Sequence, residues 1–177
     1  SYIGPLSRFQ KSNNIKTGKF VSDILIIISG PEPQRSKFEK IILNQVKEIK
    51  DKKIIITRGK PKHNKETEIE GIQIINHLNS TDMYTALMNT DIVISRAGYS
   101  TVMGLIILQK KALLIPTPGQ TEQEYLMKHL EKYKLFLFKL QSKLNLKKDC
   151  SELKEFEAEI EIDYLKELAA NETNINR

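Results

Sequence analysis

Apolar residues follow two alternating patterns along the first third of the chain. Residues 23–29 (DILIIIS) form a nearly continuous β-branched run, which is typical of a strand buried on both faces of a sheet. From about residue 34 to residue 50, apolar residues recur at helical spacing, with Lys and Glu on the other face. This change of period predicts a buried strand followed by an amphipathic helix.

The same alternation continues to the end of the chain. Further strands are predicted at 53–57, 72–75, 91–95, 112–115 and 135–140, and further helices at 81–88, 102–108 and 121–132. Residues 60–70 are interpreted as a charged loop, and the chain beyond residue 142 as helical, notably from Glu157 to Ala170. Six strands alternating with helices predict an α/β fold, a doubly wound parallel sheet with helices on both faces.

The composition divides the chain into three parts. Residues 1–22 are polar and rich in turn-forming residues, and we expect a linker or incoming segment there. Residues 23–142 carry the predicted sheet, and residues 143–177 are expected to be a helical extension. The chain begins with Ser1 rather than Met, so it is expected to be a fragment of a longer protein that lacks an N-terminal domain.

Charge and cysteine content exclude several classes of protein. The net charge is +6, but the lysines are scattered among glutamates and no aromatic residues interleave with a basic run, so nucleic acid is not an expected partner. The single cysteine, Cys150, excludes an internal disulfide framework and fits a reducing compartment. No stretch approaches the roughly 20 apolar residues of a transmembrane helix. We therefore expect a cytoplasmic protein, with peripheral contact at the inner face of the membrane left open.

Ligands of doubly wound sheets bind beyond the carboxyl ends of the strands, near the point where the strand order reverses. The first loop of interest follows the first strand. Ser29 and Gly30 are small enough for backbone N–H groups to approach an anion, and Arg35 could add a charge-assisted hydrogen bond. An ordinary strand-to-helix turn explains the same residues equally well.

The second loop, Ser95 to Thr101, joins the fourth predicted strand to a Ser/Thr-capped helix. Gly98, Ser100 and Thr101 offer N–H and O–H donors at a helix N-terminus, which suits an anion such as a diphosphate. Arg96 faces either the ligand or a neighbouring loop. Plain helix capping by Ser100 or Thr101 is an equal alternative.

The third loop begins near Thr117 and ends in the first turn of a helix. A carboxylate and an amide from Glu122, Gln123 and Glu124 could hold sugar hydroxyls, which need paired donors and acceptors. Acidic residues are also favoured at helix N-termini, and Glu124 is spaced to form a capping box with Thr121, so helix capping remains an alternative.

Other chemistries lack their motifs. The three histidines are widely separated and have no second cysteine to join them, so no metal site is expected. A dinucleotide fingerprint, a P-loop, a D-x-D triplet and a G-x-S-x-G nucleophile elbow are all absent from the sequence.

Two segments together resemble a known family. Residues 91–101 (DIVISRAGYST) and 111–125 (KALLIPTPGQTEQEY) are similar to the C-terminal, donor-binding half of GT-B glycosyltransferases, and in particular to glycosyltransferase family 28. The resemblance extends from about residue 23 to residue 140. It implies a Rossmann-like domain that holds a nucleotide-sugar, usually UDP-linked, without a metal or other cofactor. The acceptor, which is not identified, and the catalytic base would belong to the N-terminal domain.

The resemblance also implies roles for individual residues. The diphosphate would contact residues of the first and second loops: Ser29, Gly30, Arg35, Arg96, Gly98, Ser100 and Thr101. The base edge of the nucleoside would bind the backbone of Asn76, His77 and Leu78. The sugar would bind Gln123 with Gln120, Glu122 or Glu124 beside it. The implied activity is transfer of a hexosyl group by an inverting mechanism.

The resemblance breaks at one position on the helix after the second loop. The family commonly carries an acidic residue there that reaches the ribose hydroxyls, whereas this chain has Gly104. A non-catalytic, partner-binding scaffold with the same fold is therefore the alternative to a donor-binding domain.

Overall fold

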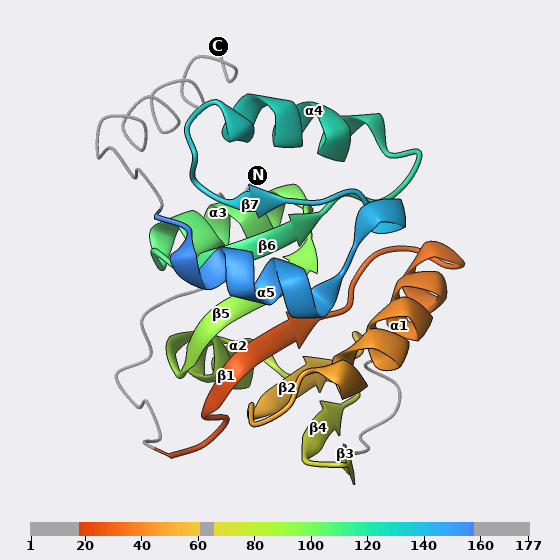
Figure 1. Ribbon diagram of the computed structural model, residues 1–177, viewed down its shortest axis with the longest axis vertical. Coiled ribbons are helices and arrows are strands. Elements are labelled where there is room, and N and C mark those ends of the chain that lie inside the picture. Colours follow the sequence, from red (N-terminus) through yellow and green to blue (C-terminus); the bar gives the residue numbers. More distant parts are fainter. Residues whose placement is uncertain (1–17, 61–65, 158–177) are drawn as a thin grey trace.

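The computed structural model describes residues 18–60 and 66–157, which form one sheet with helices on both faces (Figure 1). The strands are β1 (Ser22–Ile27), β2 (Ile54–Thr57), β3 (Glu66–Ile69), β4 (Ile72–Ile75), β5 (Thr90–Arg96), β6 (Lys111–Ile115) and β7 (Leu137–Phe138). The helices are α1 (Gln34–Gln45), α2 (Ser80–Met88), α3 (Tyr99–Ile107), α4 (Thr121–Glu131) and α5 (Leu146–Glu155), with 3₁₀ turns η2 (Val46–Glu48) and η3 (Gln141–Lys143).

The strand order is β3-β4-β2-β1-β5-β6-β7, and every pair except β3–β4 is parallel. The order reverses between β1 and β5, where Leu25 lies opposite Val93. The predicted α/β fold with a doubly wound parallel sheet is confirmed. Ligands of such sheets are expected at the carboxyl ends of β1 and β5.

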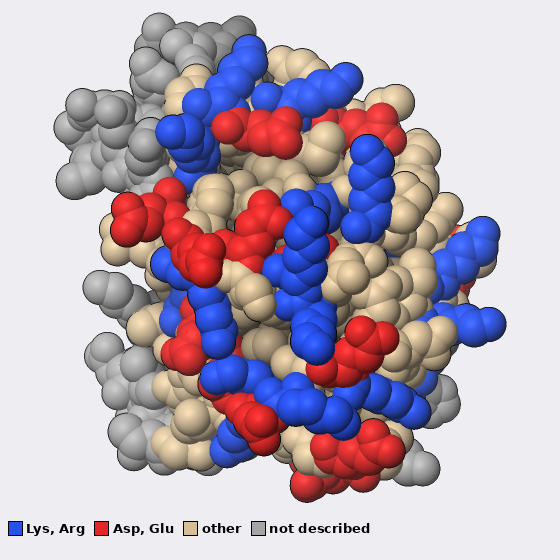
Figure 2. Space-filling view, in the orientation of Figure 1, with Lys and Arg blue, Asp and Glu red and all other residues tan. Residues whose placement is uncertain are grey.

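Each face of the sheet has its own apolar core, because successive side chains of a strand point to opposite faces. Leu25 and Val93 pack with α2, α3 and Leu130 of α4. Ile24 and Ile26 pack on the other face with α1 and α5, which lie on the viewer's side of the sheet in Figure 1. On that side of the molecule, basic and acidic side chains are interspersed (Figure 2), as the scattered lysines of the sequence predict.

Three predicted segments are corrected by the structure. Within the predicted loop at 60–70, Glu66–Ile69 forms the antiparallel edge strand β3, and a tight turn at Glu70 and Gly71, both with positive φ, leads into β4. All four residues of β3 are exposed, so no apolar alternation marked the strand. The strand predicted at 135–140 is reduced to β7, and the helix predicted at 34–50 ends at Gln45, where η2 follows.

The helix caps add a further correction. The side chain of Asn79 caps α2, so this helix begins at Ser80, one residue before the predicted start. The N-cap of α4 is Gln120 and no side chain caps that helix, so the predicted capping box is wrong. The incoming segment at 1–17 and the helix from 158 to 170 lie outside the described residues. No helix in the described part of the chain has the length and apolar character needed to cross a membrane.

Candidate functional site

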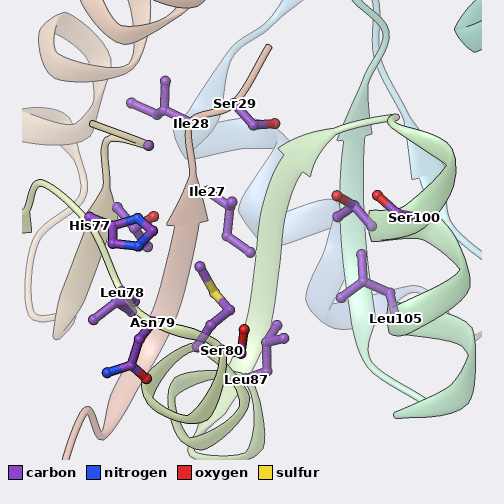
Figure 3. Close-up of a pocket in the computed structure, with 14 residues that line it drawn as sticks. Ile27, Ile28, Ser29, His77, Leu78, Asn79, Ser80, Leu87, Ser100 and Leu105 are labelled. Atoms are coloured by element: carbon purple, nitrogen blue, oxygen red, sulfur yellow. The ribbon is translucent and has the colours of Figure 1, made fainter. Parts of the chain in front are cut away.

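The first candidate site is a cleft of about 430 Å³ at the carboxyl ends of β1, β2 and β4. We call it the α2–α3 cleft, because residues of these two helices line it (Figure 3). Its volume lies within the range of small-molecule sites. Its lining comprises Ile27, Ile28, Ser29, Thr57, Gly59, His77, Leu78, Asn79, Ser80, Met83, Leu87, Ser100, Thr101 and Leu105.

The cleft brings together residues predicted from three separate loops. Ser29 comes from the end of β1, His77 and Leu78 from the loop after β4, and Ser100 and Thr101 from the first turn of α3. Figure 3 shows His77 and Leu78 on one side of the cleft and Ser100 on the opposite side. The predicted diphosphate and nucleoside residues therefore face one another across a single space.

The N-terminus of α3 is built without a side-chain cap. Its N-cap is Gly98, and the N–H groups of Thr101 and Val102 both donate to the Gly98 carbonyl at 3.0 Å. Neither Ser100 nor Thr101 is the N-cap, so the alternative of plain capping by these residues is wrong. The positive end of the α3 dipole thus borders the cleft, and the N-cap residue of this helix has no side chain to bind its N–H groups.

The N-terminus of α2 is occupied by its own residues. The Asn79 Oδ1 accepts a hydrogen bond from the Asp82 N–H at 2.8 Å, and Asn79 Nδ2 donates to the Asp82 carboxylate at 3.0 Å. Asp82 in turn pairs with Lys19 at 2.9 Å. Asp82 does not line the cleft, but the Asn79 cap already binds a first-turn N–H group of α2, so α3 is the end that suits an anion.

A second, shallower cleft of about 740 Å³ lies between the N-termini of α3 and α4. We call it the α3–α4 cleft; its lining comprises Ala97, Gly98, Tyr99, Gln120, Thr121, Glu122, Gln123, Tyr125 and Leu126. Three of the four predicted sugar residues line it, and Glu124 does not. The Gln123 amide is held in place because Oε1 accepts from the Thr117 N–H at 2.8 Å and Nε2 donates to Gln120.

Two predicted arginines do not face either cleft. Arg35 donates to Glu39 and to the Arg58 carbonyl, both at 3.2 Å, and also pairs with Glu32. Arg96 is 1% exposed and bonded to neighbouring loops. Each guanidinium is held by protein acceptors away from the clefts, so the predicted contacts of Arg35 and Arg96 with a diphosphate are not supported.

Two smaller predictions also change. Gly30 lies next to Ser29 but lines neither cleft, and its φ of +104° fits the turn that leaves β1. Asn76 is buried behind His77, where its Oδ1 accepts from Arg58 at 3.2 Å and its carbonyl accepts from the Lys60 N–H at 2.7 Å. Asn76 therefore supports the loop from behind, whereas His77 and Leu78 reach the cleft.

Behind that loop lies an ionic cluster that the sequence analysis did not identify. The Glu39 carboxylate is buried on α1 and pairs with Arg58, with Arg35 at 3.2 Å and with Lys60 at 3.4 Å. Through Arg58 the cluster reaches Asn76. A signal was present in the sequence, since Glu39 falls between Phe38 and Ile42 on the apolar face of the predicted helix.

The α2–α3 cleft carries almost no charge. His77 is the one titratable side chain that lines it, and no Asp or Glu is among its lining residues. Within residues 18–60 and 66–157, no group of three His, Cys, Asp or Glu side chains is arranged to hold a metal ion. To an anionic ligand the cleft offers the first N–H groups of α3 and the hydroxyls of Ser100 and Thr101, and none of its lining residues is a carboxylate that would repel the ligand.

The model of the glycosyltransferase family 28 C-terminal domain matches residues 25–175. The chain belongs to this family. A curated family 28 relative is the UDP-N-acetylglucosamine--N-acetylmuramyl-(pentapeptide) pyrophosphoryl-undecaprenol N-acetylglucosamine transferase of Sulfurihydrogenibium sp. (strain YO3AOP1). It is 28% identical over 109 residues, which cover 60% of this chain and 30% of the relative.

Solved structures of GT-B glycosyltransferases share the fold of this family 28 domain. The spinosyn forosaminyltransferase SpnP is 12% identical, with a TM-score of 0.50 over 72% of this chain and 32% of its own. The glycosyltransferase SnogD of Streptomyces nogalater is 14% identical, with a TM-score of 0.50 over 77% of this chain and 34% of its own. The chain thus spans about a third of the length of these proteins.

Gly104 is buried in α3 and is not itself among the residues that line the α2–α3 cleft. At 100° per residue, its direction falls between those of Ser100 and Thr101, which both line the cleft. No carboxylate among the lining residues takes the place of the acidic residue that the family commonly has there.

Proposed function

We propose that this chain is the donor-binding domain of an inverting, metal-independent glycosyltransferase whose donor is a UDP-sugar. The observation that carries the proposal is the N-terminus of α3. It lacks a side-chain cap, it borders a cleft at the reversal of the strand order, and Ser100 and Thr101 in its first turn line that cleft. Family membership supplies the reaction class.

In this proposal the donor lies across both clefts. Its diphosphate binds at the N-terminus of α3, with Ser29 opposite, and its base lies against His77 and Leu78. Gly98 and Tyr99 line the α3–α4 cleft, so a sugar on the far side of the diphosphate would reach Gln123. Donors and acceptors of the Gln123 amide match sugar hydroxyls.

The proposed reaction is a direct displacement at the anomeric carbon. An acceptor oxygen forms a bond to this carbon as the bond to the diphosphate oxygen breaks, so the configuration inverts. Negative charge grows on the leaving diphosphate, and the N-terminus of α3 stabilises it without needing to reorganise. The acceptor's proton passes to a base that we expect in the N-terminal domain, and no residue of this chain is assigned that role.

The lining of the α2–α3 cleft supports a donor site that uses no metal. A divalent cation on a diphosphate is usually held by carboxylates, and the residues that line this cleft provide none. The positive end of a helix dipole would instead offset part of the diphosphate charge.

The curated relative suggests a class of acceptor. Its name includes a pyrophosphoryl-undecaprenol group, which is a lipid. We propose that the protein works in the cytoplasm, and that a lipid-linked acceptor would bring it to the inner face of the membrane together with its own N-terminal domain.

Titration calorimetry with UDP and UDP-sugars tests the donor site in the protein that contains this chain. Saturable binding is expected for UDP, and no saturable binding at millimolar ligand would contradict the proposal. Gly104 favours one alternative, a non-catalytic scaffold, because it removes a contact to the ribose. That alternative is supported if the full-length protein neither binds nor transfers any nucleotide-sugar.

A further inference from the structure

Arg96 ends the central strand β5 and is the largest fully buried side chain, at 1% exposure. Within the described part of the chain, no Asp or Glu pairs with its guanidinium. Burial lowers the pKa of Arg96 to about 10, so the group is still charged at neutral pH. An apolar side chain would fill the same space without the cost of desolvating a charge. The groups that the Arg96 guanidinium binds must therefore explain why an arginine is buried here.

The guanidinium binds oxygens from three segments that follow different strands. Nη1 donates to the Pro116 carbonyl after β6 at 3.2 Å. Nη2 donates to the Gln34 carbonyl at the start of α1 at 3.2 Å and to Gln141 Oε1 in η3 at 2.6 Å. The ring of Phe38 lies beneath it, with its centroid 4.0 Å from Arg96 Cζ. Arg96 thus holds these segments from the α1 side of the sheet, whereas the candidate clefts lie towards α3.

One of these contacts leads directly to the α3–α4 cleft. The Pro116 carbonyl that accepts from Arg96 belongs to the same planar peptide as the Thr117 N–H. That N–H donates to Gln123 Oε1 at 2.8 Å. Because the two groups of one peptide turn together, the hydrogen bond from Arg96 fixes the direction of the donor that Gln123 accepts.

The same contact decides which way the Gln123 amide points. With Oε1 bound to the Thr117 N–H, the amide nitrogen is turned towards Gln120, to which it donates. Both glutamines line the α3–α4 cleft. We infer that Arg96 is a positioning residue that sets the orientation of the Gln123 amide through the Pro116–Thr117 peptide. The effect on the donor rests on the proposed function, in which Gln123 contacts the sugar.

The experiment is a double-mutant cycle in the full-length protein. Arg96→Lys keeps the charge and loses the planar fork, Arg96→Met keeps only the bulk, and Gln123→Ala removes the amide. For each variant the affinities for UDP and for the tightest binder among UDP-glucose, UDP-galactose and UDP-N-acetylglucosamine are measured. The affinity for the UDP-sugar divided by the affinity for UDP isolates the contribution of the sugar.

We expect both Arg96 variants to lower this ratio about tenfold, as Gln123→Ala does, while the affinity for UDP changes by less than about twofold. The double variants should be no worse than Gln123→Ala alone, because both changes remove the same contact. Arg35→Met is the matched control, since Arg35 is a partly buried arginine on the same side of the sheet that contacts neither Pro116 nor Gln123. It should leave the ratio unchanged.

Additive losses from Arg96 and Gln123 would overturn the inference, as would equal losses for UDP and the UDP-sugar. Loss of the folded state in both Arg96 variants would also overturn it, because the guanidinium would then support the whole domain. If the wild-type protein binds no nucleotide, the proposed function fails. The same double-mutant cycle is then measured through the free energies of unfolding in urea. Non-additive free energies of unfolding are then expected, and additive ones contradict the positioning role.

Discussion

The N-termini of α2 and α3 border the same cleft and are built in opposite ways. Asn79 caps α2 through its side chain, and Asp82 adds a carboxylate in the first turn. α3 begins after Gly98, with no side-chain cap and no acidic residue in its first turn. When side chains of a helix already bind its first N–H groups, few of these groups remain for an anion. The N-cap residue and the third helical residue therefore decide which of two neighbouring helices can bind an anion.

The largest expected effect comes from placing a carboxylate at each helix end in turn. Ser100→Glu would put a negative charge beside the proposed diphosphate, a repulsion of about 2 kcal/mol at an effective dielectric of about 20. We expect the affinity for UDP to fall about thirtyfold. Ser80→Glu, in the first turn of α2, is the matched control because Ser80 lines the same cleft, and its effect should stay below about threefold. Titration calorimetry measures both, and equal losses would remove the distinction between the two helices.

The next effect tests the second turn of α3. Gly104→Glu would restore a carboxylate on the cleft side of the helix, where it could accept a hydrogen bond from a ribose hydroxyl. Such a bond to a charged group contributes about 1.5 kcal/mol, so UDP should bind about tenfold more tightly. Gly104→Ala is the control and should leave the affinity unchanged. Equal affinities for the Glu and Ala variants would show that the ribose does not lie beside Gly104.

The cap of α2 can be removed without touching α3. Asn79→Ala takes away the oxygen that accepts from the Asp82 N–H at 2.8 Å. The free energy of unfolding should fall by about 1 kcal/mol, as for other N-cap residues. Urea unfolding measures the change, and Gly98→Ala is the counterpart at α3. Because Gly98 makes no side-chain cap hydrogen bond, that variant should cost less than Asn79→Ala, and equal costs would contradict the comparison.

The smallest effect gives α3 the cap that α2 already has. Gly98 has a φ of −71° and its nearest neighbour to an added Cβ is Thr101 Oγ1 at 4.0 Å, so Gly98→Asp fits sterically. The new carboxylate should stabilise the fold by a few tenths of a kcal/mol and at the same time weaken UDP binding. Urea unfolding and titration calorimetry on the same variant test whether the fold becomes more stable while the affinity for UDP falls. Tighter binding of UDP would argue against an anion at α3.

The sequence predicted the parts of the fold that depend on burial. β1 and β5 are continuous apolar runs because helices cover both faces of the sheet, and their parallel direction followed from the alternation with helices. β3 escaped prediction because it lies at an edge and all four of its residues are exposed. Its only sequence signal was the Glu70-Gly71 turn that precedes β4.

The candidate site was predictable where the backbone decides the position. Ser29, His77 and Ser100 lie in or just after the loops that leave β1, β4 and β5, so these parallel strands bring them to one edge of the sheet. The direction of a long side chain depends on its partners, which the sequence does not reveal. Arg35 turns to Glu39, and Arg96 turns to the Pro116 carbonyl in a neighbouring loop, which was one of its two expected directions, so the structure supports neither diphosphate contact.

The exposed strand β3 has a consequence for behaviour in a crowded solution. β4 carries Ile72, Ile74 and Ile75, and an unpaired apolar strand of this kind is a template for strand addition between molecules. β3 covers that edge and presents Glu66 and Glu68 outwards on an exposed strand. Two copies meeting edge to edge would bring like charges together, so the isoleucine-rich sheet is protected from aggregation at its most vulnerable side.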